Sequence, residues 1–184
     1  GLDRARKIQE RGYLKDLSFN LEASLKAAEA SVLAAIKEGS LRNGPKDDSF
    51  DAALLQLVPL RFSGPVDSAQ KTVERIHHDL RLGDTPDLSG FLYRYKRRDD
   101  FGNPQSAFLV CSFWLVQSLA RTGKLEEARQ AMTAAMSSAN SLGLFAEHYL
   151  PARKLQAGNF PQAYSHVGQI LAAFAVSPDW SEVL

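Results

Sequence analysis

The apolar run from Leu109 to Ala120 is the feature that most constrains how this chain can fold. Only Ser112, Gln117 and Ser118 interrupt it, so a helix built from it has almost no polar face and must be covered on most sides. The run is shorter than the roughly 20 residues that a membrane span needs. It therefore predicts a buried helix, and Pro104 suits the first position of that helix.

Apolar residues elsewhere recur at the three- and four-residue steps that are typical of amphipathic helices. These steps predict helices over 17–38, from Ser49 to Pro59, over 66–82, over 124–142 and from near Pro161. The apolar residues of the last helix are expected to be buried: Tyr164, Val167, Ile170, Leu171 and Phe174. No alternating strand of convincing length appears, so we expect an all-α fold of helical hairpins.

Composition describes an ordinary soluble globular protein: 184 residues, 45% hydrophobic and 23% charged. A formal charge of +1 gives no field to attract nucleic acid or an anionic membrane, so neither partner is expected. The single cysteine, Cys111, cannot form an internal disulfide, and four histidines without paired spacing give no metal site. We therefore expect no metal and no other cofactor.

The N-terminus shows no signal peptide, which together with the single cysteine favours a cytoplasmic location. Residues 1–7, however, have the composition of a helix interior, so the natural chain is expected to begin further upstream. The cellular compartment therefore stays open at this point.

Two irregular segments carry the candidate functional side chains. The helical period is lost over 84–103, and loops longer than about 12–15 residues are uncommon unless they have a function. A second irregular segment follows Gly143. Their polar and aromatic residues are Tyr93, Arg94, Tyr95, Asp99, Asp100, Glu147 and Tyr149. Long loops at one end of helical hairpins are typical of a fold that bears a site.

The motifs that carry a family resemblance are Tyr93-Arg94-Tyr95, 99–104, 107–116, Glu147 and 158–166. In this order and spacing they resemble the C-terminal part of glycoside hydrolase family 15, which holds glucoamylases, glucodextranases and some microbial trehalases. The resemblance implies an (α/α)6 barrel, or six-hairpin toroid. Residues 1–184 would be the C-terminal portion of this single catalytic domain, about half of the barrel, and would require the missing N-terminal half as a partner.

The same resemblance implies an inverting enzyme that acts on an α-glucan or α-glucoside. Glu147 would be the general base that activates water, and Arg94 would contact substrate hydroxyls. Tyr93, Tyr95, Asp99 and Tyr149 are further candidates for substrate binding. An inverting hydrolase needs two carboxyl groups about 6.5–9.5 Å apart, and the family's general acid lies upstream of this chain. The 184 residues alone are therefore expected to be inactive.

Alternatives remain open at the level of sequence. Arg94 could instead form an ion pair with Asp99 or Asp100 and hold the loop. The departures from the family pattern at Gln105 and at Leu150-Pro151 leave details of sugar binding unsettled. The chain could also be a non-catalytic helical scaffold or a glycan- or protein-binding module, although no repeat of about 34 residues is visible.

Overall fold

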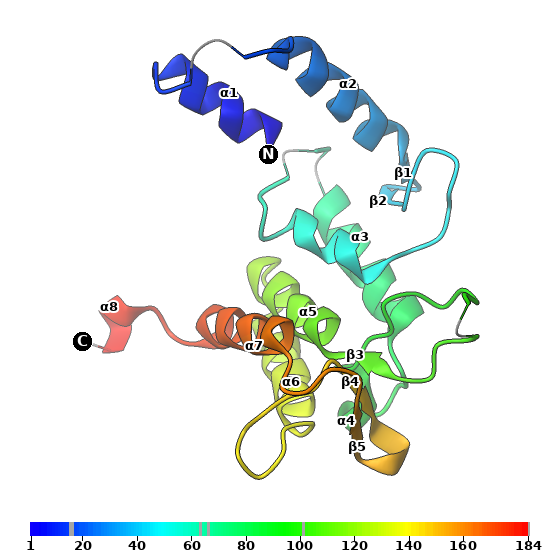
Figure 1. The fold of residues 1–184 in the computed structure, drawn as a ribbon. Coiled ribbons are helices and arrows are strands. Elements are labelled where there is room, and N and C mark those ends of the chain that lie inside the picture. The colour runs from blue at the N-terminus through cyan, green and yellow to red at the C-terminus, as the bar shows by residue number, and fades with distance from the viewer. Residues whose placement is uncertain (15–16, 63, 66, 101, 184) are drawn as a thin grey trace.

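The computed structural model describes residues 1–14, 17–62, 64–65, 67–100 and 102–183. Its helices are α1 (Leu2–Glu10), α2 (Leu21–Ala34), the 3₁₀ helix η1 (Ala52–Leu57), α3 (Ser68–Leu80), α4 (Pro86–Ser89), α5 (Leu109–Arg121), α6 (Leu125–Met136), the 3₁₀ helix η2 (Pro151–Arg153), α7 (Ala163–Val176) and α8 (Trp180–Val183). The strands are β1 (Ile36–Lys37), β2 (Ser40–Leu41), β3 (Ala107–Phe108), β4 (His148–Leu150) and β5 (Leu155–Ala157). The fold is mainly helical, as expected (Figure 1).

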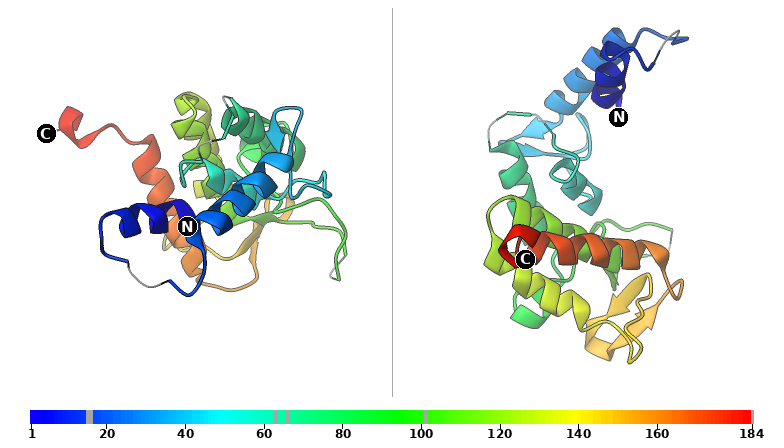
Figure 2. Two further views of the ribbon diagram at one scale, coloured as in Figure 1. Left: turned by 90° about the horizontal axis from the view of Figure 1, so that it is seen from above. Right: turned by 90° about the vertical axis from the view of Figure 1, so that its left-hand side faces the viewer.

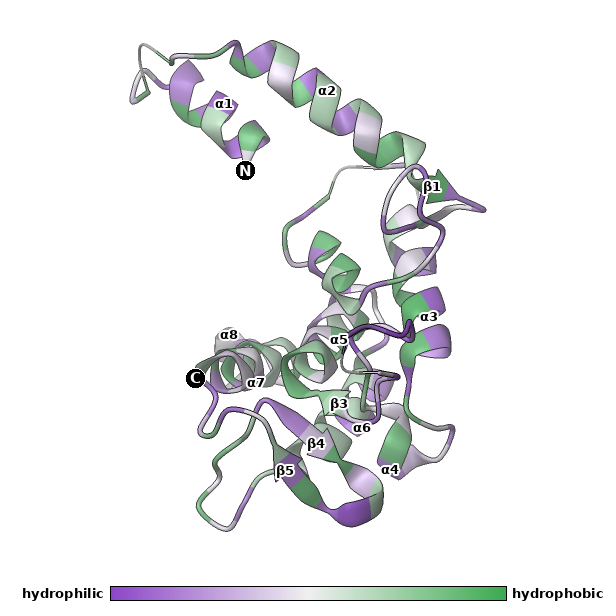
Figure 3. Cartoon of the chain, turned by 45° about the vertical axis from the view of Figure 1, so that its right-hand side comes forward, coloured by the Kyte–Doolittle hydropathy of each residue, from purple (hydrophilic) through white to green (hydrophobic). Residues whose placement is uncertain are grey.

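Helix α5 forms the centre of the core, which confirms the prediction of a buried helix. Ten of its 13 residues are buried, and α6, α7, η1 and α3 pack around it (Figures 1 and 3). Its start at Pro104 was expected and is wrong, because the helix begins at Leu109. Ala107 and Phe108 form β3 instead, and pairing with β4 requires an extended backbone there.

In the part of the chain that the structure describes, five short strands of two or three residues accompany the helices. β1 and β2 form an antiparallel pair, and β3, β4 and β5 form a three-stranded antiparallel sheet in that order. In this sheet His148 lies opposite both Phe108 and Ala157. Strands of two or three residues are too short to show an alternating pattern in a sequence, which explains why they were missed.

Three of the other predicted helices form with altered bounds or type. The segment from Ser49 to Pro59 contains the 3₁₀ helix η1, which Asp51 rather than Ser49 caps. Helix α3 occupies most of 66–82, although residue 66 lies outside the described residues. Helix α6 stops at Met136 instead of Leu142. The hydroxyls of Ser137 and Ser138 donate to the carbonyls of Ala134 and Ala135, and such bonds compete with continuation of the helix.

The N-terminal helices α1 and α2 contact each other and project from the rest of the chain (Figures 1 and 2). The helix predicted over 17–38 is limited to Leu21–Ala34, and Leu21 is its only buried residue. Helix α1 has no buried residue at all. None of the helices that the structure describes is long and apolar enough to cross a membrane.

The apolar side chains of α7 that were predicted to be buried are exposed. Small residues, Ser165, Gly168 and Ala172, face the core instead. A Cβ added at Gly168 would lie 3.1 Å from the Cβ of Phe113 on α5, so the two helices approach closely there. The period of the apolar residues predicts that α7 has an apolar face, but it does not show which element packs against that face. Because α5 and α7 approach closely, only small side chains of α7 fit between the two helices.

His77 on α3 is expected to make stability depend on pH. Its Nε2 is 3.0 Å from the carbonyl oxygen of Ser89, and burial lowers the pKa of the half-buried ring. The folded protein therefore binds the proton less readily than the unfolded chain, whose histidine pKa is about 6.5. Stability is fully present above this value and falls, by at most about 1.4 kcal/mol per pH unit, as the pH drops below it.

The measurement is thermal unfolding of the complete natural polypeptide at pH 7.5 and 5.5. His77→Gln should reduce the fall in melting temperature between the two values. His78→Gln is the matched control, because His78 is its exposed neighbour on the same helix. An equal fall in the wild type and the His77→Gln protein would contradict the assignment.

Candidate active site

The backbone of Glu147 is fixed on both sides by hydrogen bonds. The Glu147 amide donates to the carbonyl of Asn159 at 2.9 Å, and the Glu147 carbonyl accepts from the amide of Leu109 at 3.0 Å. The residue therefore lies directly before β4, between the first residue of α5 and the segment that leads to α7. Glu147 is therefore tied to the central core helix α5 through the amide of Leu109.

The carboxylate of Glu147 is held through one oxygen. Both the backbone amide and the side-chain Nδ2 of Asn159 donate to Oε2, at 3.2 and 3.1 Å. Within the described part of the chain, nothing donates a hydrogen bond to Oε1. One oxygen is thus oriented by the protein, and the other can accept a hydrogen bond from a water molecule or a ligand.

Gly158 provides the space that this arrangement needs. Its φ of 78° lies in the left-handed region that favours glycine. A Cβ at this position would lie 2.8 Å from Oε2 of Glu147 and 3.1 Å from Cδ2 of His148. No other residue type could occupy the position without displacing the carboxylate.

Glu147 lines a hollow of about 580 Å³, here called the Glu147 hollow. Its lining residues are Arg94, Tyr95, Asp99, Gly102, Asn103, Pro104, Gln105, Ser106, Phe108, Glu147 and His148. The structure therefore brings four of the six predicted site residues to one place. The lining contains two carboxylates, which belong to Asp99 and Glu147.

Arg94 forms its ion pair with Asp51, which is neither of the two partners considered from the sequence. Its Nε lies 3.3 Å from Oδ2 of Asp51, whose Oδ1 accepts from the amide of Ala53 and so caps η1. The Arg94 carbonyl also accepts from the amide of Ala52 at 2.8 Å. The side chain is 53% exposed, and no described residue accepts a hydrogen bond from its two Nη groups. They can donate to a ligand.

Tyr95 and Asp99 are joined by a hydrogen bond of 2.7 Å from the phenol to Oδ2. This bond to the carboxylate is the main cause that raises the pKa of Tyr95, because it stabilises the protonated phenol. The guanidinium of Arg97 lies 4.8 Å from the centre of the same ring. Asp99 and Gly102 also exchange two backbone hydrogen bonds, which close the tip of this loop.

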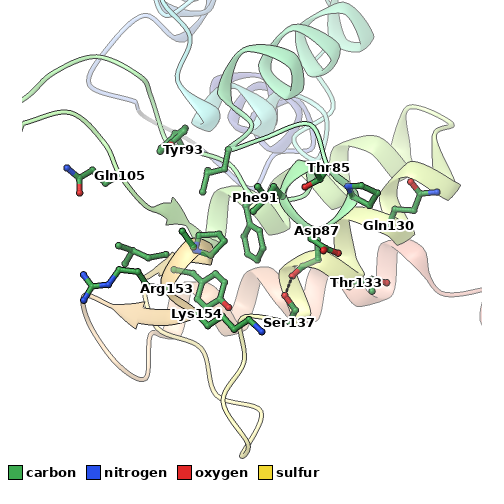
Figure 4. A pocket seen from close by; sticks show the side chains of 18 residues that line it. Thr85, Asp87, Phe91, Tyr93, Gln105, Gln130, Thr133, Ser137, Arg153 and Lys154 are labelled. Atoms are coloured by element: carbon green, nitrogen blue, oxygen red, sulfur yellow. Dashed lines mark hydrogen bonds between the residues drawn. The ribbon is translucent and has the colours of Figure 1, made fainter.

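Tyr93 and Tyr149 lie in a second and larger hollow of about 1020 Å³, here called the Tyr149 hollow (Figure 4). Tyr149 is only 7% exposed, and its ring centre lies 5.2 Å from that of Phe91. Arg153 and Lys154 line the same hollow. Gln105 lines both hollows. The six predicted site residues are therefore divided between two neighbouring hollows.

Three residues of this region were not assigned a role from the sequence: Asp51, Ser106 and His148. Asn159 was expected only to cap the last helix, which is wrong because the N-cap of α7 is Gln162. Nδ1 of His148 lies 3.1 Å from the hydroxyl of Ser106, and its ring stacks on Phe108 with centres 4.9 Å apart. The position of Asn159 within the 158–166 motif was the only signal available for it. No metal-binding group of three or more His, Cys, Asp or Glu residues is found among the residues described.

Comparison with known proteins gives relatives that match nearly the whole chain. The trehalase of Mycolicibacterium smegmatis is 34% identical over 180 residues, and that of Mycobacterium tuberculosis is 32% identical over 179 residues. Each match covers 95% of this chain but 26% of the relative. A protein of Sulfolobus acidocaldarius named trehalase 2 is 30% identical over 93% of the chain. No family model matches.

Solved structures share the fold. A wild-type glycosidase superposes with a TM-score of 0.68 at 21% identity, covering 85% of this chain and 44% of the glycosidase. A variant of that glycosidase in complex with glucose gives the same TM-score. The chain thus spans about a quarter of the length of its curated relatives and less than half of its structural neighbours. Residues 1–184 are thus similar to one part of a trehalase-like glycoside hydrolase.

Proposed function

We propose that the natural polypeptide containing these residues is an inverting hydrolase of α-linked glucosides, with Glu147 as its general base. The observation that carries this proposal is the environment of the Glu147 carboxylate. Oε2 accepts two hydrogen bonds from Asn159, whereas Oε1 accepts none from a described residue and belongs to a side chain that lines a hollow. A general base needs this combination of fixed orientation and one free oxygen.

In the proposed reaction, Oε1 accepts a proton from a water molecule while the water oxygen attacks the anomeric carbon. The bond from this carbon to the glycosidic oxygen breaks on the opposite face, so the configuration inverts. The leaving oxygen takes its proton from a general acid that is supplied by another part of the polypeptide. The two free Nη groups of Arg94 would donate to substrate hydroxyls.

Because the relatives are named trehalases, trehalose is the first substrate to test. Maltose and isomaltose are tested beside it as examples of other α-linked glucosides. Glucose release by the complete natural polypeptide is the decisive assay. With trehalose, inversion forms β-glucose at the attacked carbon, while the leaving glucose keeps its α configuration, so proton NMR during the first minutes should show the two anomers in equal amounts. Release of α-glucose alone would contradict inversion, and we expect the isolated 184 residues to release no glucose.

A glycan-binding module without catalysis is the alternative that the same experiment separates. Such a module would lose ligand binding with Arg94→Ala but would not need the carboxylate of Glu147. Binding without glucose release, unaffected by Glu147→Gln, would therefore replace the enzymatic proposal.

A further inference from the structure

Helix α7 turns its large side chains outward and its small ones inward. We call the five large apolar residues the α7 outer face: Tyr164, Val167, Ile170, Leu171 and Phe174. Their side chains are between 50% and 68% exposed. The view from the side of the molecule shows α7 in front of α5 and α6, with the short helix α8 in front of its C-terminal end (Figure 2). A large apolar face of this kind is normally covered in a stable protein.

The charge pattern separates α7 from a helix that is adapted to water. Residues 155–178 contain no Asp, Glu, Lys or Arg. Helix α1, which has no buried residue, carries ion pairs from Arg6 to Asp3 and Glu10 and from Lys7 to Asp3. Depletion of charged residues is typical of the centre of an interface. The absence of cations along this sequence also gives anionic lipid or nucleic acid nothing to bind.

We propose that the α7 outer face is an interface within one polypeptide, covered by helices that lie outside residues 1–184. The curated relatives are almost four times as long as the matched segment, and the structural neighbours are more than twice as long with the same fold. Further helices of the same chain are therefore available to cover it. An uncharged apolar helix face of this kind fits another apolar helix face.

The first test is thermal unfolding of the complete natural polypeptide with the double substitution Ile170→Glu and Phe174→Glu. Two buried carboxylates should lower the melting temperature by roughly 5–10 °C. Leu142→Glu is the matched control, because Leu142 is 78% exposed and lies in the loop after α6. The control should change the melting temperature by less than about 1 °C. An equally small change in the double variant would overturn the proposal.

The second test remains informative if the double variant fails to fold. Single Ile170→Cys and Leu142→Cys proteins are treated with a thiol reagent under native conditions, where the native Cys111 is buried and stays unlabelled. We expect Ile170→Cys to react at least about tenfold more slowly than Leu142→Cys, because opening of the interface must precede labelling. Equal rates would overturn the proposal, as would protection that appears only at high protein concentration, since this would assign the face to a second copy. Neither readout uses catalytic activity.

Discussion

Glu147→Gln in the complete natural polypeptide is expected to lower kcat for glucoside hydrolysis by roughly 10²–10⁴-fold, the range that a positioned general base contributes. The amide has nearly the size of the carboxylate, and its oxygen can still accept from Asn159. It cannot take a proton from water. The loss should therefore appear in kcat, with a much smaller change in KM. Initial rates with the best of the three sugars provide the measurement.

Glu126→Gln is the control for this substitution. Glu126 is an exposed residue in the first turn of α6, so the same chemical change there should leave kcat and the melting temperature within error. If Glu147→Gln retained more than about half of the wild-type kcat, Glu147 would not be the general base. The base would then have to be sought among other carboxylates, of which Asp99 also lines the Glu147 hollow.

The burial of α5 could be predicted because it follows from composition alone. A helix with almost no polar face has to be covered, whichever elements do it. The burial of α7 could not be predicted in the same way. Its outer face has the right period, but Gly168 allows α5 to approach on the opposite side, and the cover for the large residues belongs to none of the described elements.

The sequence names candidate site residues but does not indicate how they are arranged. Arg94 pairs with Asp51, 43 residues away, and no local pattern indicates a contact over that separation. Tyr93 and Arg94 are neighbours in sequence but line different hollows. Side chains of successive residues in an extended segment point to opposite sides, so adjacency in sequence does not place two residues in one site. The support for Glu147 came from the whole set of motifs, because an isolated loop carboxylate carries little information.

Gly158→Ala tests whether kcat depends on the position of the Glu147 carboxylate, because this substitution moves the carboxylate without changing it chemically. The new Cβ would lie 2.8 Å from Oε2, the flexible end of the Glu147 side chain, so the carboxylate must move away from Asn159. A shift of about 1 Å in a reacting group can cost on the order of 100-fold in rate. We expect kcat to fall roughly 10–100-fold although the carboxylate is still present.

Gly143→Ala distinguishes this effect from backbone strain. Gly143 has a φ of 74°, close to the 78° of Gly158, but a Cβ there meets nothing within 4 Å. Both substitutions place alanine in the left-handed region, which costs about 1–2 kcal/mol, so both should lower the melting temperature by a similar few degrees, roughly 2–8 °C. Only Gly158→Ala should lower kcat. If the two variants lost stability equally and both kept wild-type kcat, the hydrogen bonds from Asn159 would not be what positions the base, because catalysis would then tolerate a displaced carboxylate.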